Sequence, residues 1–231
     1  MMLDRFSNLP KQNGEYFFCM ICLTTFKERY SNFTCQKKKI PDLVLYDAIT
    51  PQLKGFEKEC AKLDFHPILK REQGTKALWL SNIKIFEYFL KTRYKYLIIL
   101  EDDSIVPENL QEILNKEYIN HKDFLKLGGV RLGQYSSCNL YNKYCVKKIF
   151  ETINKYPIDR GIDHYISNIP TGTKEKRPYI FNKKLSELPS TITKVNPEIA
   201  KKSVRISYNK NFLSKEKIKN LLFSFFDKFL S

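Results

Sequence analysis

Strand patterns and helical patterns alternate along the first hundred residues of the chain. Nearly continuous apolar runs at 16–23, 43–48 and 96–100 are typical of strands that are covered on both faces. The stretch 24–30 indicates a turn into a short helix, and 74–92 predicts a longer helix with a broad apolar face. This order predicts an α/β domain with a central mixed, mostly parallel sheet that is flanked by helices.

Further elements follow the strand at 96–100. Pro107 and the residues after it, to about 116, predict a helix, and a later buried strand ends at Gly128 and Gly129. Another short strand is predicted at 136–141, followed by an amphipathic helix at 143–155. Because glycine has no side chain, the backbone at the glycine pair can approach a ligand closely.

Composition shifts divide the chain into three parts. Residues 1–15 read as an N-terminal lead-in, 16–192 as a single domain, and 193–231 as a basic C-terminal extension. The extension ends in an amphipathic helix with one apolar stripe at helical spacing. The stripe consists of Ile218, Leu221, Leu222, Phe225, Phe226, Phe229 and Leu230.

The C-terminal helix has two interpretations. Residues 201–231 carry eight Lys or Arg against two acids. Basic residues beside an aromatic-rich apolar stripe are typical of a helix that lies on an anionic membrane surface. Alternatively, the stripe packs on the core of its own domain, or on a second subunit in a homodimer.

Three consecutive carboxylates give the strongest chemical signal. Glu101, Asp102 and Asp103 directly follow an apolar strand, at the end where open α/β sheets bind ligands. If the extended conformation persists, Glu101 and Asp103 point to one side and Asp102 to the other. The crowded charges need a counter-charge, which a divalent cation carrying substrate phosphates would supply. Alternatively, the acids cap the helix that follows Pro107.

Composition and charge narrow the class of protein. With 231 residues, 42% of them hydrophobic, the chain can form one sizeable core. No apolar run reaches the roughly 20 residues of a membrane span, and the N-terminus lacks a signal-peptide core, so we expect a cytoplasmic protein. The net charge of +15 requires an acidic partner. Zinc-finger spacing and RNP-like motifs are absent from the sequence, so we expect no nucleic-acid partner.

The six cysteines are scattered and lie mostly in apolar sequence, which agrees with a cytoplasmic location. Cys19 and Cys22 have the spacing of half a zinc site, but no second pair completes four ligands. The buried strand predicted at 16–23 accounts for both of them, so we expect no structural zinc.

Four segments carry a resemblance to a known family. The sequence LEDD at 100–103 is similar to a metal and nucleotide-sugar motif, and DFLKLGG at 123–129 is similar to a strand that ends in LGG. Residues 138–148 and 161–165 are similar to two further conserved segments. Together they resemble glycosyltransferase family 25 over roughly residues 16–192. One departure is Asn82, which stands where the family has histidine.

The resemblance implies a GT-A-like fold and the transfer of a hexose, galactose or glucose, from a UDP-sugar to a hydroxyl of an acceptor glycan. Asp103 and Glu101 would hold Mn²⁺ or Mg²⁺ as a Lewis acid for the departing diphosphate. Asp102 would contact the ribose or the sugar, and Gly128 and Gly129 would lie against the donor.

An inverting transfer needs a carboxylate that takes the proton of the acceptor hydroxyl. Asp163 is the first candidate and Asp159 the second, although Asp163 could instead cap the following helix. Arg29 either lies near the phosphates of the donor or is a solvated helix residue. We expect His164 to be structural and not a metal ligand.

Two rival functions stay open at the level of sequence. The change at Asn82 allows a catalytically impaired protein that binds sugar or nucleotide, and the charge allows a membrane-associated scaffold. A lipid-linked glycan acceptor, as in lipopolysaccharide biosynthesis, would require peripheral attachment to the inner face of the membrane. Hydrolysis of the donor would separate the enzyme from both rivals.

Overall fold

The computed structural model describes the chain from residue 5 to residue 167 with gaps, and a short segment near residue 195. The described residues are 5–9, 14–108, 110, 112, 114, 124–128, 138–167 and 194–195. They all belong to one compact unit, Met1–Asn196. The predicted C-terminal amphipathic helix lies outside the described residues.

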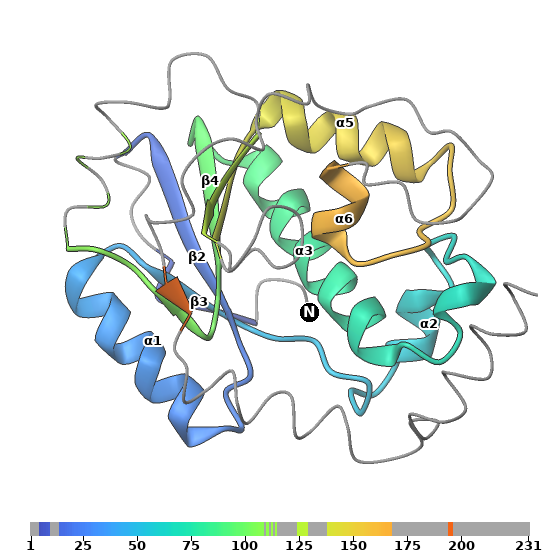
Figure 1. Cartoon of the computed structure of the whole chain (residues 1–231), viewed down its shortest axis with the longest axis horizontal. Helices are drawn as coiled ribbons and strands as arrows, with labels where there is room; N and C mark the ends of the chain where they lie inside the picture. The colour runs from blue at the N-terminus through green and yellow to red at the C-terminus, as the bar shows by residue number, and fades with distance from the viewer. Residues whose placement is uncertain are drawn as a thin grey trace, which may run out of the picture. The chain divides into compact units, whose positions relative to one another are not determined.

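A mixed six-stranded sheet forms the centre of this unit, in the order β1-β3-β2-β4-β7-β6 (Figure 1). The strands are β1 Phe6–Ser7, β2 Tyr16–Cys22, β3 Val44–Asp47, β4 Tyr96–Glu101, β6 Phe124–Gly128 and β7 Cys138–Asn142. Strands β3, β2 and β4 are parallel, and the other pairs are antiparallel. The predicted α/β fold is confirmed, but parallel pairing is limited to the three central strands.

Two strand pairs extend beyond the predicted domain. Phe6–Ser7 pairs with β3 in antiparallel fashion, within the region interpreted as a lead-in. Next to it, Arg5 donates to the carbonyl oxygens of Asp47 and Ala48, each at 2.8 Å. A separate small sheet joins β5 (Ser104–Ile105) to β8 (Lys194–Val195). Periodicity does not reveal such strands, because two residues are too few to show an alternation.

Strand β2 shows why the central strands are apolar throughout. All seven of its residues are buried. Phe17, Cys19 and Ile21 face one hydrophobic cluster, whereas Phe18 and Met20 face another. Both faces of the sheet are therefore covered, as the uninterrupted apolar run predicts.

Helices cover the two faces unequally. On one face lie α3 (Gln73–Lys91), α5 (Lys143–Ile153) and α6 (Ile162–Ser167), with α2 (Phe56–Cys60) near the start of α3 (Figure 1). On the other face lies α1 (Lys27–Lys39), which continues well beyond the short helix predicted at 24–30. Of the helix predicted at 107–116, the described residues 110, 112 and 114 are helical, whereas 107 and 108 come before the helix.

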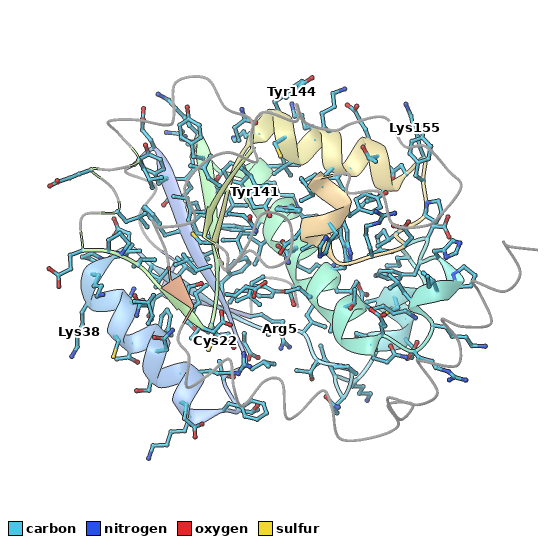
Figure 2. All side chains as sticks on the ribbon, viewed as in Figure 1. Arg5, Cys22, Lys38, Tyr141, Tyr144 and Lys155 are labelled. Atoms are coloured by element: carbon cyan, nitrogen blue, oxygen red, sulfur yellow. The ribbon has the colours of Figure 1, made fainter. Side chains whose placement is uncertain are left out.

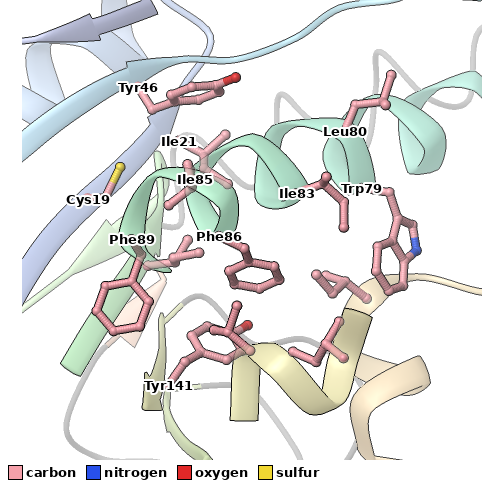
Figure 3. Packing of buried hydrophobic residues seen from close by; sticks show 14 of the residues in the cluster. Cys19, Ile21, Tyr46, Trp79, Leu80, Ile83, Ile85, Phe86, Phe89 and Tyr141 are labelled. Atoms are coloured by element: carbon pink, nitrogen blue, oxygen red, sulfur yellow. The ribbon is translucent and has the colours of Figure 1, made fainter. Parts of the chain in front are cut away.

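The larger cluster forms around α3. Trp79 and Phe86 are fully buried, as predicted for core residues. Phe86 contacts Tyr141 edge to face, with ring centroids 5.1 Å apart, in the layer between α3 and β7 (Figure 3). In contrast, Lys38, Tyr144 and Lys155 lie at the periphery and point outward (Figure 2).

Candidate functional site

The parallel register brings the carboxyl ends of β2 and β4 together. Ile21 lies opposite Glu101, so the chain leaves both strands at the same edge of the sheet. The Leu23 N–H then donates to Asp102 Oδ2 at 2.9 Å. We call Glu101, Asp102 and Asp103 the acidic turn. It is thus joined to the loop that leads from β2 into α1.

Asp102 is buried and forms an ion pair with α1. Its Oδ1 accepts a hydrogen bond from the Arg29 guanidinium, and the two side chains keep 6% and 15% of their exposed areas. Burial raises the pKa of Asp102, whereas the Arg29 charge and the Leu23 N–H act in the opposite direction. The interpretation of Arg29 as a solvated residue is therefore wrong. A contact of Arg29 with donor phosphates stays a prediction.

Amide side chains on the buried face of α1 hold the backbone around the acidic turn. Asn32 Nδ2 donates to the carbonyl oxygens of Asp102 (3.0 Å) and Ser104 (2.9 Å). One helical turn later, Gln36 Oε1 accepts from the Val106 N–H at 3.0 Å, and Gln36 Nε2 donates to Asn32 Oδ1 at 3.2 Å. Hydrophobic periodicity reveals neither Asn32 nor Gln36, because both are polar. Their spacing of four, which places them on one helical face, was the available signal.

The negative charges of the other two carboxylates, Glu101 and Asp103, are little offset by hydrogen bonds or nearby positive charges. Asp103 Oδ1 is buried and has no hydrogen-bond partner among the described residues. Burial, and then the charge of Asp102, raise the pKa of Asp103 to about 6. Burial, and then the charges of Asp163 and Asp103, raise the pKa of Glu101 well above its usual range. Such carboxylates favour either a bound proton or a nearby cation.

Glu101 and Asp103 fit a divalent cation that is shared with a substrate. Carboxylate oxygens suit Mg²⁺ and Mn²⁺, and Asp103 offers a buried oxygen without a partner. In the part of the chain that the structure describes, no group of three or more His, Cys, Asp or Glu side chains is arranged to hold a metal alone. Magnesium commonly binds one or two carboxylates and takes its other ligands from substrate phosphates and water.

Helix α6 brings Asp163 toward the acidic turn. The charge of Asp163 acts on Glu101 and also on Tyr141 of β7, and in both cases it adds to burial in raising the pKa. The helix begins at Ile162, so Asp163 lies in its first turn and not at the N-cap position that the alternative interpretation gave it. Asp163 is therefore close enough to Glu101 for its charge to disfavour ionisation of that carboxyl.

Asp159 lies in a different environment. Its two carboxylate oxygens accept from Arg160 Nε (2.8 Å) and from the terminal nitrogen Nη2 (2.7 Å). The side chains of Asp159 and Arg160 are 4% and 11% exposed. The Arg160 carbonyl in turn accepts from Trp79 Nε1 at 2.8 Å, which joins this loop to α3. Bidentate binding to arginine engages both oxygens of Asp159, so its local role is to hold the loop before α6.

Gly128 lies at the same edge of the sheet as the acidic turn. Gly128 on β6 and Leu100 on β4 both lie opposite Cys138 on β7. The two residues are therefore separated by one strand, about 10 Å in the hydrogen-bonding direction. An irregularity in the β6–β7 register falls between Lys126 and Gly128. Gly129 lies outside the described residues.

Two further positions bear on the sequence analysis. His164 Nδ1 on α6 is buried and has no hydrogen-bond partner among the described residues. Asn82 keeps 3% of its exposed area, and its Nδ2 donates to the Leu78 carbonyl within α3 at 2.9 Å. Asn82 is thus buried, and the hydrogen bond described for its side chain lies within α3.

Comparison with known proteins identifies the class of protein that has this fold and this candidate site. Residues 17–184 match glycosyltransferase family 25 (LPS biosynthesis protein), so the chain belongs to that family. Over 119 residues it is 32% identical to a protein of Haemophilus influenzae (strain ATCC 51907 / DSM 11121 / KW20 / Rd) named "Putative glycosyltransferase". The match covers 50% of this chain and 42% of that relative. No described helix is long and apolar enough to cross a membrane.

Proposed function

We propose that the protein transfers a hexose, galactose or glucose, from a UDP-sugar to a hydroxyl of an acceptor glycan with a divalent cation. The observation that carries this proposal is Asp103, whose buried Oδ1 lacks a hydrogen-bond partner among the described residues at the sheet edge where ligands bind. Family membership supports glycosyl transfer as the type of reaction.

The residues of the acidic turn would have different roles in donor binding. Glu101 and Asp103 would hold Mn²⁺ or Mg²⁺, which offsets the charge that develops on the departing diphosphate when it is bound. Asp102 and Arg29 form an ion pair within the site, so Asp102 can orient a hydroxyl of the ribose or sugar while Arg29 keeps its charge balanced. Gly128 lies at the same sheet edge and admits the donor closely.

Asp163 is the residue that we assign as the base. It would take the proton of the acceptor hydroxyl as that oxygen forms a bond to the anomeric carbon and the bond from this carbon to the diphosphate breaks. UDP leaves with the electron pair, and the configuration at the anomeric carbon inverts. We prefer Asp163 to Asp159 because Asp163 lies near Glu101, whereas both oxygens of Asp159 are bound by Arg160.

A catalytically impaired sugar-binding or scaffold protein is the alternative, and it rests on Asn82. In the structure Asn82 is buried within α3, where it does not contact the acidic turn through any hydrogen bond of its side chain that is described. The described contacts of Asn82 therefore give no specific support to the impaired alternative. We therefore favour the enzyme.

The cellular setting is also a proposal. The basic C-terminal extension would bind anionic lipid and place the protein on the inner face of the membrane, close to a lipid-linked acceptor. The competing interpretation is that the amphipathic helix predicted in this extension packs on the domain or in a homodimer. Co-sedimentation with anionic and neutral vesicles separates them, because only attachment by charge depends on anionic lipid and weakens with salt.

The decisive experiment is a screen of nucleotide-sugars for thermal stabilisation of the full chain, with and without Mn²⁺. We expect one UDP-hexose to raise the melting temperature only when Mn²⁺ is present, and the same donor to be hydrolysed slowly or transferred. Asp103→Ala should abolish the metal-dependent shift and leave the fold intact. Equal stabilisation in excess chelator, with Asp103→Ala fully competent, would contradict the proposal.

A further inference from the structure

The buried amide of Asn32 donates hydrogen bonds to the backbone on both sides of Asp103. Asn32 Nδ2 donates to the carbonyl of Asp102, the residue before Asp103, at 3.0 Å. It also donates to the carbonyl of Ser104, the residue after Asp103, at 2.9 Å. Asn32 comes from α1, about 70 residues earlier in the chain, and is 7% exposed. One side chain thus joins the carbonyl groups of the two residues next to a candidate metal ligand.

We infer that Asn32 is a positioning residue for Asp103, because it fixes the backbone on both sides of the carboxylate that would bind the cation. This inference rests on the proposed function, since it assigns a role to Asn32 within the same donor site. Asn32 contacts neither the cation nor the sugar. It acts by setting the direction in which the Asp103 side chain leaves the main chain.

The hydrogen-bond pattern leaves one orientation for the Asn32 amide. Its Nδ2 faces two carbonyl oxygens, and its Oδ1 accepts from Gln36 Nε2 at 3.2 Å. A flipped amide would place an oxygen against two oxygens and leave the Gln36 donor facing another donor. The two carbonyl acceptors are enough to set this orientation, and the longer contact with Gln36 agrees with it.

Asp103 depends on this backbone more than an ordinary carboxylate would. Its buried Oδ1 has no hydrogen-bond partner among the described residues, so no hydrogen bond to that oxygen orients the side chain. Residues that orient metal ligands typically contribute 10–100-fold to metal affinity, as order-of-magnitude values. We expect Asn32 to contribute to metal affinity in the same way, because it holds the backbone carbonyls of Asp102 and Ser104.

A merely structural role, in which Asn32 attaches α1 to the sheet, makes a different prediction, and Gln36 supplies the control. Gln36 is also a buried amide on α1, and its Oε1 accepts from the N–H of Val106, three residues after Asp103. If the contacts only join the helix to the sheet, loss of either amide should have the same consequences. If Asn32 positions Asp103, metal affinity should separate the two variants.

The test compares Asn32→Leu and Gln36→Leu in the full chain. Melting temperature is measured without metal, and Mn²⁺ binding in the presence of UDP is followed by the electron paramagnetic resonance signal of free Mn²⁺. We expect both variants to melt at a lower temperature. Only Asn32→Leu should raise the dissociation constant for Mn²⁺, by about 10-fold or more, while Gln36→Leu changes it by less than about threefold.

Three results would overturn the inference. Wild-type Mn²⁺ affinity in a folded Asn32→Leu shows that Asn32 does not position Asp103, and equal weakening in both variants shows a structural role. If the wild-type chain binds no Mn²⁺ with UDP, the metal-dependent donor site itself is wrong, and that result is distinct from the first two. Should Asn32→Leu fail to fold, Asn32→Ala against Gln36→Ala gives the same comparison with the same expected difference.

Discussion

The two faces of the central sheet are built from different kinds of contact. On one face, α3 packs Trp79, Phe86 and their neighbours into a largely apolar layer. On the other, α1 buries only Asn32, Phe33 and Gln36, and the two amides bind the backbone around the acidic turn. The α3 face supplies most of the apolar burial. The α1 face supplies directed hydrogen bonds, which fix geometry more than they add stability.

The same division separates the carboxylates of the site. Asp102 pairs with Arg29 of α1, whereas Glu101 is influenced most strongly among charged residues by Asp163 of α6, on the α3 face. Strand β4 ends at Glu101 and residues 102–103 form a turn, so the extended conformation considered for all three acids does not persist. The electrostatic effects on the acids at the end of β4 therefore come from residues of both α1 and α6.

The largest expected effect lies on the α3 face. Phe86→Ala removes a fully buried ring that contacts Tyr141, and we expect it to lower the free energy of unfolding by about 3–5 kcal/mol. Chemical denaturation of the folded variant measures this loss. Tyr144→Ala, which truncates an aromatic side chain that is 55% exposed, is the matched control and should change stability little. Similar losses in both variants would mean that the apolar layer is not the source of the stability.

Next in size is the ion pair on the α1 face. Arg29→Met leaves the buried Asp102 carboxylate without its counter-charge, which we expect to cost about 3 kcal/mol of stability at neutral pH. Lys38→Met, on the exposed side of the same helix, should cost close to nothing.

The double variant Arg29→Met, Asp102→Asn tests the cause of this loss. Removal of the carboxylate charge should restore most of the stability, because the penalty comes from an uncompensated buried charge. Denaturation of the four proteins gives the coupling free energy between the two residues. Strictly additive effects of the two substitutions would show that the pair does not couple.

The difference between the faces also explains what could be predicted from sequence. Helix α3 and strands β2 and β4 were found because their buried residues are apolar and recur at the spacing of a helix or strand. Helix α1 was predicted too short because its buried face is largely polar, and Asn32 and Gln36 carry no hydrophobic periodicity. Their partners are backbone groups about 70 residues away, which only the folded chain brings near.

The acidic turn itself was recognisable because three adjacent acids after an apolar strand are unusual in composition and position. Their individual environments were not recognisable. The ion pair of Asp102 with Arg29 and the bidentate pair of Asp159 with Arg160 depend on how loops meet at the sheet edge. The sequence therefore offers two candidate bases, and the folded chain shows that they have different environments.

A smaller effect is expected from Asp163, and it concerns turnover. If Asp163 takes the acceptor proton, Asp163→Asn should lower the transfer rate by about 10²-fold with donor affinity nearly unchanged. Transfer kinetics and donor binding, measured on the same preparation, check this. Asp159→Asn should instead reduce stability, because it breaks the pair with Arg160. Loss of turnover in Asp159→Asn alone would move the assignment of the base to that residue.

The smallest expected effect is a dependence of stability on pH that comes from Asp103. Its folded pKa of about 6 lies above the ordinary value of 3.8, so the folded chain holds the proton more tightly than the unfolded chain does. Stability of the metal-free protein should therefore fall by roughly 2 kcal/mol as the pH rises from about 4 through the folded pKa, and level off near pH 7. Asp103→Asn should flatten this part of the profile, whereas Asp42→Asn at an exposed turn should leave it unchanged. Denaturation midpoints between pH 4 and pH 7, measured in chelator, give the comparison. An identical slope in wild type and Asp103→Asn would show that the Asp103 carboxylate carries no such penalty. In that case its buried oxygen has another partner, and a cation would not be needed to offset its charge.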